Sequence, residues 1–186
     1  MNQTPHFIVL TGGPGVGKTT LLTELQRQGF SIVPEDARRI IKEQLETGGD
    51  GLPWKNKLHY AELMLQASCT SYEQQVSKNT DQYVFFDRGI PDALTYIDME
   101  GLAVEEQLLQ EAKERRYHKK VFILPPWEAI YENDNERKQT WKEAEDTFNV
   151  LKDTYEKLGY ETIEVPKITV NERVQFILKN IELKNY

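Results

Sequence analysis

Short apolar runs alternate along the chain with longer segments in which apolar residues recur every three or four positions. The short runs predict buried strands, and the longer spacing predicts amphipathic helices. The expected strands are 7–10, 31–33, 83–86, 121–124 and 162–165. Helical spacing is clearest over 58–76, 141–158 and 171–181. Strands that alternate with helices in this way indicate βαβ units and a mostly parallel α/β sheet.

Length and charge narrow the class of protein. A chain of 186 residues predicts one domain over 1–186, with a core large enough to fold alone. Lys and Arg total 23 against 30 for Asp and Glu, so the net charge is −7. This balance argues against nucleic acid or an anionic membrane as a general partner, because both attract positively charged surfaces. One local positive pocket remains compatible with it.

Cysteine usage and the termini point to the cytoplasm. Cys69 is the single cysteine, which excludes an internal disulfide and a zinc cluster built on cysteines. The first five residues lack the basic start of a signal peptide, and no apolar stretch approaches the roughly 18 residues that span a bilayer. We therefore expect a soluble cytoplasmic protein, whose oligomeric state the sequence leaves open.

A glycine-rich loop directly after the first strand carries the strongest motif. It fits G-x-x-x-x-G-K-[ST] at every fixed position, between an expected strand and an expected helix. Glycines let backbone N–H groups approach phosphate oxygens, and the following helix adds the positive end of its dipole. Lys18 is expected to bridge the β- and γ-phosphates, and the Thr19 hydroxyl to ligate Mg²⁺. The predicted nucleotide-binding residues are Gly12, Gly13, Pro14, Gly15, Val16, Gly17, Lys18, Thr19 and Thr20.

Charged residues follow the second and third strands. Carboxyl ends of strands in an open parallel sheet face one crevice, so Glu35 and Asp87 are expected near the loop. Asp87 suits a direct Mg²⁺ ligand beside Thr19 or a group that binds Mg²⁺ through water, with an ordinary acid at a strand end as the alternative. Glu35 is interpreted as a general base or orienting group for an attacking hydroxyl, with stabilisation of the next helix's dipole as the alternative. Arg88 either holds a phosphate or acceptor, or forms a surface salt bridge.

A further cation precedes the helical pattern of 141–158. Arg137 and Lys138 are expected to open that helix, where positive charge opposes the helix dipole. The acidic-polar stretch 132–136 comes just before them. This arrangement is typical of a lid, here about 132–140, that delivers Arg137 to transferring phosphates. The alternative is a solvated helix start whose charges balance one another.

Taken together, these segments resemble a family of small P-loop ATPases and kinases that includes the ribosylnicotinamide kinase domain of NadR. More distantly, they are similar to deoxynucleoside and thymidylate kinases. The resemblance rests on residues 12–20, 35–38, 86–92, 133–138, 165–166 and 171–173. It implies a three-layer α/β/α P-loop sandwich with a five-stranded parallel sheet of order 2-3-1-4-5. It further implies Asp87 near Mg²⁺ and the late loop near the adenine of ATP, but it does not fix the acceptor.

The leading interpretation is a Mg²⁺-dependent enzyme that moves the γ-phosphoryl group of ATP to a small, nucleoside-like acceptor. Phosphoryl transfer needs mainly positioning and charge stabilisation, which Lys18, Arg88 and Arg137 would supply. The alternative is an ATPase or a nucleotide-gated regulatory protein without a small acceptor. A nucleic-acid end kinase is disfavoured, because it needs a basic channel that the scattered basic residues do not form.

Overall fold

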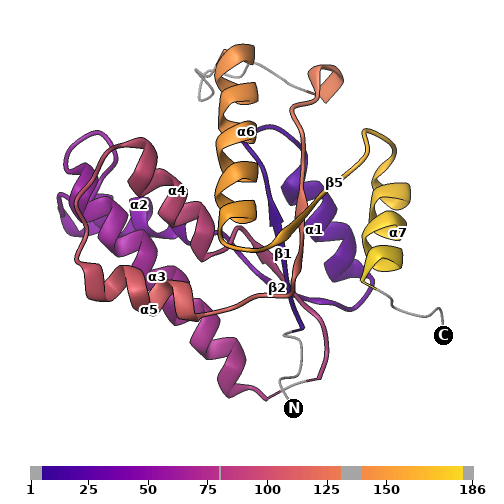
Figure 1. Cartoon of the computed structure of the whole chain (residues 1–186), viewed down its shortest axis with the longest axis horizontal. Coiled ribbons are helices and arrows are strands. Elements are labelled where there is room, and N and C mark those ends of the chain that lie inside the picture. The colour runs from indigo at the N-terminus through magenta and orange to yellow at the C-terminus, as the bar shows by residue number, and fades with distance from the viewer. Residues whose placement is uncertain (1–5, 80, 131–139, 182–186) are drawn as a thin grey trace.

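A computed structural model of the chain describes residues 6–79, 81–130 and 140–181 (Figure 1). Its strands form one sheet of order β2-β3-β1-β4-β5, in which every neighbouring pair is parallel. The strands are β1 (Phe7–Thr11), β2 (Ser31–Val33), β3 (Val84–Asp87), β4 (Lys120–Ile123) and β5 (Glu161–Glu164). Each lies within one residue of the expected run, so the predicted α/β class and strand order are confirmed.

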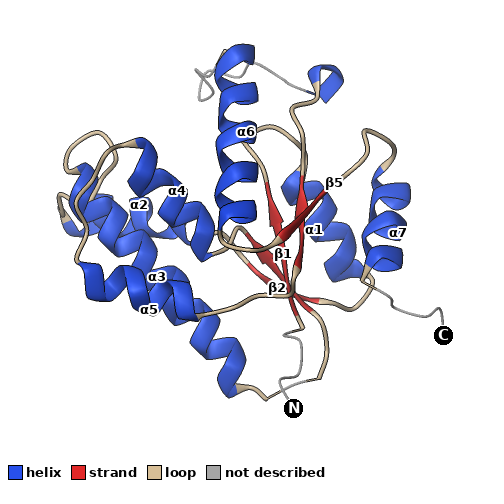
Figure 2. Ribbon diagram, in the orientation of Figure 1, coloured by secondary structure: helices blue, strands red, loops and turns tan. Residues whose placement is uncertain are grey.

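Helices cover both faces of this sheet, which gives the three layers expected (Figure 2). They are α1 (Lys18–Arg27), α2 (Asp36–Thr47), α3 (Lys57–Ser77), α4 (Ile90–Met99), α5 (Glu106–Glu114), α6 (Trp141–Lys157) and α7 (Val170–Asn180), with a short 3-10 helix η1 (Glu128–Ile130). Figure 1 shows α1 and α7 on one side of the sheet and α2 to α5 on the other. Within the described ranges, no helix combines the length and hydropathy needed to cross a bilayer.

Side chains of the central strand β1 pack into two hydrophobic cores, one on each face of the sheet. Phe7 and Val9 pack into a cluster with residues of α3, α4 and α6. Ile8 and Leu10 pack on the opposite face against α1 and α7. Because both faces are covered, residues 7–10 of this strand are all apolar instead of alternating with polar residues. Parallel pairing with β3 and β4 places the carboxyl end of β1, where the glycine-rich loop begins, beside the ends of these neighbours.

The expected helical patterns run past the core at their ends. Leu58 and Val76, near the two ends of α3, are exposed, and so is Trp141 at the first position of α6. Helix ends that extend past the sheet have no apolar layer beneath them. Helix α6 begins at Trp141, because the Thr140 hydroxyl caps it by accepting a bond from the Glu143 N–H. Arg137 and Lys138, which the sequence predicts at the start of this helix, lie outside the described residues.

Candidate active site

The glycine-rich loop joins β1 to α1 through backbone conformations that need glycine. Gly12 has φ +140°, and a Cβ there would lie 2.6 Å from the Leu124 carbonyl oxygen. Gly17 has φ 84° and immediately precedes α1. A side chain at either position would strain or displace the backbone. The sequence therefore fixes a tight loop whose exit is the N-terminus of a helix.

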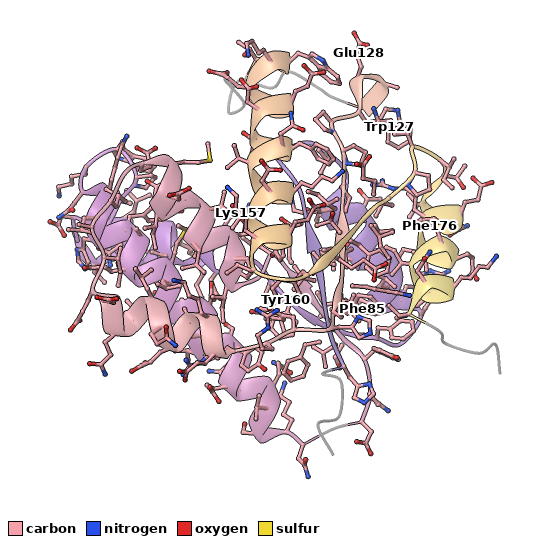
Figure 3. The ribbon with its side chains drawn as sticks, in the orientation of Figure 1. Phe85, Trp127, Glu128, Lys157, Tyr160 and Phe176 are labelled. Carbon is pink, nitrogen blue, oxygen red and sulfur yellow. The ribbon has the colours of Figure 1, made fainter. Side chains whose placement is uncertain are left out.

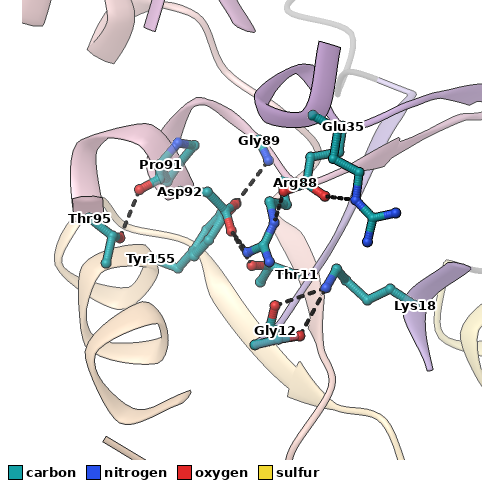
Figure 4. A network of polar contacts seen from close by, with 12 residues as sticks. Thr11, Gly12, Lys18, Glu35, Arg88, Gly89, Pro91, Asp92, Thr95 and Tyr155 are labelled. Carbon is teal, nitrogen blue, oxygen red and sulfur yellow. Dashed lines mark hydrogen bonds and ion pairs between the residues drawn. The ribbon is translucent and has the colours of Figure 1, made fainter. Parts of the chain in front are cut away.

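Lys18 folds back over this loop (Figure 4). Its Nζ donates hydrogen bonds of 3.0 Å to the carbonyl oxygens of Gly12 and Gly13, and the side chain is buried. Burial lowers the pKa of Lys18 to about 7, and repulsion from Arg88 adds to the effect, while Asp87 opposes it. An anion bound in the loop would favour the charged ammonium and reverse this shift.

Arg88 links the ends of β2 and β3. Its Nε donates to Glu35 Oε1 at 2.8 Å, and its Nη1 donates to Asp92 Oδ1 at 3.1 Å. Burial by itself disfavours the guanidinium charge, but Asp92 and Glu35 outweigh it and raise the pKa of Arg88. The residue also has φ 70°, which side chains rarely adopt and which is strained by about 1–3 kcal/mol. The two ion pairs hold it in this conformation.

Asp92 is the hub of the polar network that Figure 4 draws. Besides Arg88, it accepts hydrogen bonds from the Thr11 hydroxyl at 2.5 Å, the Gly89 N–H at 2.9 Å and the Tyr155 hydroxyl at 2.6 Å. These donors come from β1, the start of α4 and α6. Sequence reasoning did not assign Asp92 or Tyr155 to the site. Asp92 reads locally as an acid that begins a helix, and Tyr155 as part of an apolar stripe.

Asp87 is half-buried beside Lys18 and Arg88, and its Oδ1 atom has no hydrogen-bond partner among the described residues. Burial raises the pKa of Asp87, and the neighbouring Glu35 carboxylate adds to this, whereas Lys18 opposes it. Removing an unpaired carboxylate oxygen from water is costly unless a cation compensates it. The oxygen donors of Asp87 and the nearby Thr19 fit Mg²⁺, which takes few protein ligands and completes its shell with phosphates and water. The described residues hold no group of three or more His, Cys, Asp or Glu that could bind a metal ion.

Two cavities meet at this point. The nucleotide cavity, about 590 Å³, runs along the glycine-rich loop and Lys18 toward Trp127 and Arg173. The smaller cavity, about 190 Å³, lies between the ends of β2 and β3 and the helices that follow them. We name it the acceptor cavity, after the role proposed for it below. Its apolar walls include Tyr60, Met64, Phe86, Ala93, Tyr96 and Tyr117. Both cavities share Glu35, Asp87 and Arg88 in their walls.

Unpaired buried polar atoms coincide with these cavities. Among the described residues, the buried side-chain atoms without a hydrogen-bond partner are Asp87 Oδ1, Tyr96 Oη and Arg173 Nε. Asp87 lines both cavities, Tyr96 lines the acceptor cavity, and Arg173 lines the nucleotide cavity. Buried polar groups in native proteins are normally paired, so each exception needs a reason. Ligands in the two cavities would supply it.

The far end of the nucleotide cavity combines an aromatic ring with a cation. The Arg173 guanidinium lies 5.6 Å from the centroid of the Trp127 ring, and its Nη2 donates to the Val16 carbonyl. Figure 3 shows Trp127 at the end of the molecule where α7 begins. Arg173 lies in a segment that the family resemblance placed near adenine, whereas nothing in the sequence singled out Trp127. The one sequence feature that could have pointed to Trp127 is its position directly after two prolines that follow β4.

The structure places most of the predicted residues together. The nucleotide cavity is lined by Pro14, Gly15, Gly17, Lys18, Thr19 and Thr20, with Glu35, Asp87 and Arg88 beside them. The Glu35 carboxylate makes no cap contact with α2 and pairs with Arg88 instead. This ion pair lies between the two cavities and is not at an open surface. Arg137 and the rest of the expected lid up to residue 139 lie outside the described residues, so the lid stays a prediction.

The strand order, the glycine-rich loop, and Glu35 and Asp87 in the walls of both cavities define a P-loop protein with the kinase-like topology. A family model described as "AAA domain" matches residues 7–173. The chain belongs to this AAA domain family. No curated protein matches its sequence.

Solved structures with similar folds include small-molecule kinases and NadR. NadR in complex with NR has a TM-score of 0.72 and 18% identity, covering 98% of this chain and 53% of that one. Thymidylate kinase from Ehrlichia chaffeensis has a TM-score of 0.62 and 16% identity, with 95% and 98% covered. Deoxyadenosine kinase from M. mycoides, with products bound, has a TM-score of 0.58 and 17% identity, with 94% and 98% covered. At these identities the likeness concerns the fold.

Proposed function

We propose that this protein is a small-molecule kinase that transfers the γ-phosphoryl group of ATP to a nucleoside-like acceptor. The observation that carries the proposal is the junction of two cavities at Glu35, Asp87 and Arg88. Phosphoryl transfer requires a donor and an acceptor to meet in line at one point. An ATPase needs only the nucleotide cavity. The second cavity, with its own aromatic walls, therefore favours a kinase.

The residues divide the work of the reaction between them. Lys18 and the loop N–H groups hold the phosphates of ATP. Thr19 and Asp87 would hold Mg²⁺, which when bound neutralises charge on the β- and γ-phosphoryl oxygens. The end of the nucleotide cavity that Trp127 and Arg173 line suits the base of ATP, because an aromatic ring and a guanidinium both stack on flat rings.

Glu35 and Arg88 act at the acceptor. The acceptor oxygen forms a bond to the γ-phosphorus while the bond from that phosphorus to the β,γ-bridging oxygen breaks, and ADP leaves with the electron pair. The proton of the attacking hydroxyl passes to the Glu35 carboxylate. Arg88, held between Glu35 and Asp92, offsets charge that develops on the transferred group. Arg137 is proposed to add a second positive charge from the lid.

The experiment that tests the proposal is a pooled acceptor assay. The purified protein is incubated with Mg·ATP and a mixture of nucleosides, nucleoside monophosphates, nicotinamide riboside and small sugars. Mass spectrometry then identifies any compound that gains one phosphoryl group. We expect one class of acceptor to be phosphorylated, and no product with Lys18→Ala. ADP without any phosphorylated acceptor would instead support the ATPase or switch alternative and contradict a kinase.

A further inference from the structure

Resting on the proposed function, we infer that the acceptor is a phosphate-free, ring-bearing molecule that is phosphorylated on a hydroxyl group, and not a nucleoside monophosphate. The topology alone does not make this choice, because the fold neighbours include both NadR in complex with NR and a thymidylate kinase. Three features of the acceptor cavity favour a phosphate-free acceptor: the charge of its walls, their aromatic surface and the proton acceptor at its mouth.

Charge is the first argument. Four carboxylates and one guanidinium line the acceptor cavity, so these groups sum to −3, or to −2 when Asp87, the proposed Mg²⁺ ligand, is left out. The carboxylates are Glu35, Asp36, Asp87 and Asp92. The single cation, Arg88, is already paired with Glu35 and Asp92. A phosphomonoester brings about −1.5 to −2 further charges at neutral pH. It would enter a net-negative cavity in which no described lining cation is uncommitted.

The helix ends at this cavity strengthen the argument. Helix N-termini are common phosphate sites, because their free N–H groups and dipole attract anions. Here α2 begins with Asp36, whose carboxylate accepts from the Ser71 hydroxyl at 2.9 Å and pairs with Arg39. At the start of α4, Asp92 accepts from the Gly89 N–H. Both helix starts that line the cavity therefore already carry the protein's own anions.

The aromatic walls suit a flat ring. Tyr60 and Tyr96 meet edge to face with centroids 5.5 Å apart, and Phe86 and Tyr117 do so at 5.2 Å. Burial raises the pKa of Tyr60 to about 12, with the Glu35 charge adding to it, so its phenol stays neutral. The Tyr96 hydroxyl, which has no hydrogen-bond partner among the described residues, offers one hydrogen bond to a ligand at the apolar wall. These features favour a ring with a few polar substituents.

The chemistry at the mouth agrees with a hydroxyl acceptor. A hydroxyl group must lose its proton during attack, whereas a phosphate acceptor at neutral pH is already an anion. Glu35, the proton acceptor in the proposed function, lies where the two cavities join. Carboxylates at this point serve deprotonation of a hydroxyl but repel an anionic nucleophile.

The first test compares matched acceptor pairs under Mg·ATP. The pairs are deoxyadenosine and dAMP, thymidine and TMP, cytidine and CMP, and nicotinamide riboside and its mononucleotide. We expect at least one nucleoside to be phosphorylated with kcat/KM at least about tenfold above that of its monophosphate. Faster phosphorylation of monophosphates would overturn this inference and leave the kinase assignment standing. ATP hydrolysis with no phosphorylated acceptor would overturn the kinase assignment and this inference with it.

The second test changes the charge of the cavity wall. Ser68 on α3 lines the acceptor cavity, and Ser68→Lys adds a cation there, while Ser68→Gln adds comparable bulk without charge. We expect Lys, relative to Gln, to raise the ratio of monophosphate to nucleoside turnover by about tenfold. Equal ratios in the two variants would contradict the charge argument. Circular dichroism and ATP binding check that both variants fold.

Discussion

The nucleotide cavity and the acceptor cavity share three residues but are built in opposite ways. One wall of the nucleotide cavity comes from a single short stretch of the chain, residues 14–15 and 17–20, held by local backbone geometry. The acceptor cavity draws on residues 33–37, 60–71, 86–96 and 117, which come together only in the folded sheet. A contiguous loop specifies what it binds through the backbone. The assembled cavity specifies its ligand through side chains that differ from one protein to the next.

Glu35 lines both cavities, so its replacement gives the largest expected effect on one cavity relative to the other. Replacing it by Gln keeps the shape of the residue but removes the proton acceptor, so acceptor phosphorylation should fall by about 100-fold or more, while ATP binding changes little. Steady-state kinetics and a nucleotide titration separate the two effects. Asp36→Asn, one residue along the chain, is the matched control and should cost much less. Equal losses of ATP binding and turnover in Glu35→Gln would reduce Glu35 to a structural residue.

The division between the cavities also explains what the sequence could predict. The glycine-rich loop is recognisable because its function depends on glycine at fixed spacing, and the positions of Gly12 and Gly17 in the structure show why. The three central strands β1, β3 and β4 are predictable to within one residue, because their apolar runs suit a sheet covered on both faces. Glu35 and Asp87 followed from strand order, since parallel strand ends converge.

The acceptor cavity was not predictable in the same way. Tyr60 and Tyr96 lie on helices, where an apolar residue that lines a cavity has the same spacing as one that fills a core. Tyr155 joins Asp92 across 63 positions, and no local pattern encodes that bond. Trp127 is recognised as a cavity residue only once the fold places it beside Arg173. Side-chain meetings of this kind depend on tertiary packing, which a single sequence does not display.

Lys18 provides a second test, one that concerns the nucleotide cavity alone. Its pKa is lowered to about 7 in the free protein, so at pH 8 the amine is mostly neutral. Bound phosphates favour the ammonium, so nucleotide binding should take up nearly one proton at pH 8 and affinity should fall as the pH rises above about 7. Calorimetry in buffers of different ionisation enthalpy measures this uptake. Lys18→Met should abolish the uptake, and an unchanged value in that variant would assign the proton elsewhere.

Comparing substitutions at Gly12 and Gly13 tests whether backbone geometry determines the conformation of the glycine-rich loop. A Cβ at Gly12 would meet the Leu124 carbonyl oxygen at 2.6 Å in a backbone with φ +140°, whereas a Cβ at Gly13 has no neighbour within 4 Å. Gly12→Ala should therefore destabilise the fold by about 2 kcal/mol, or about 4 to 8 °C in Tm. Gly13→Ala should leave Tm nearly unchanged. Similar melting temperatures for the two variants would show that the loop yields more easily than its contacts indicate.

Tyr155 makes the smallest and most specific prediction, because it acts on the acceptor side without touching either cavity. Its hydroxyl donates to Asp92, which in turn holds Arg88. Tyr155→Phe keeps the buried ring but leaves Asp92 with one donor fewer, at a cost of about 1 kcal/mol in stability. Since Arg88 is then held less firmly, kcat should fall a few-fold with little change in the KM for ATP.

The matched control for this effect is Tyr72→Phe. The Tyr72 hydroxyl also donates one hydrogen bond, to the Arg116 carbonyl, and its ring packs edge to face on Phe7 and Tyr117 away from Asp92. This variant should lose a similar amount of stability and keep its kcat. If both variants lower kcat equally, the effect reflects general loosening of the aromatic core. A loss confined to Tyr155→Phe would show that α6 positions Arg88 through Asp92, which links a helix outside both cavities to the point where they meet.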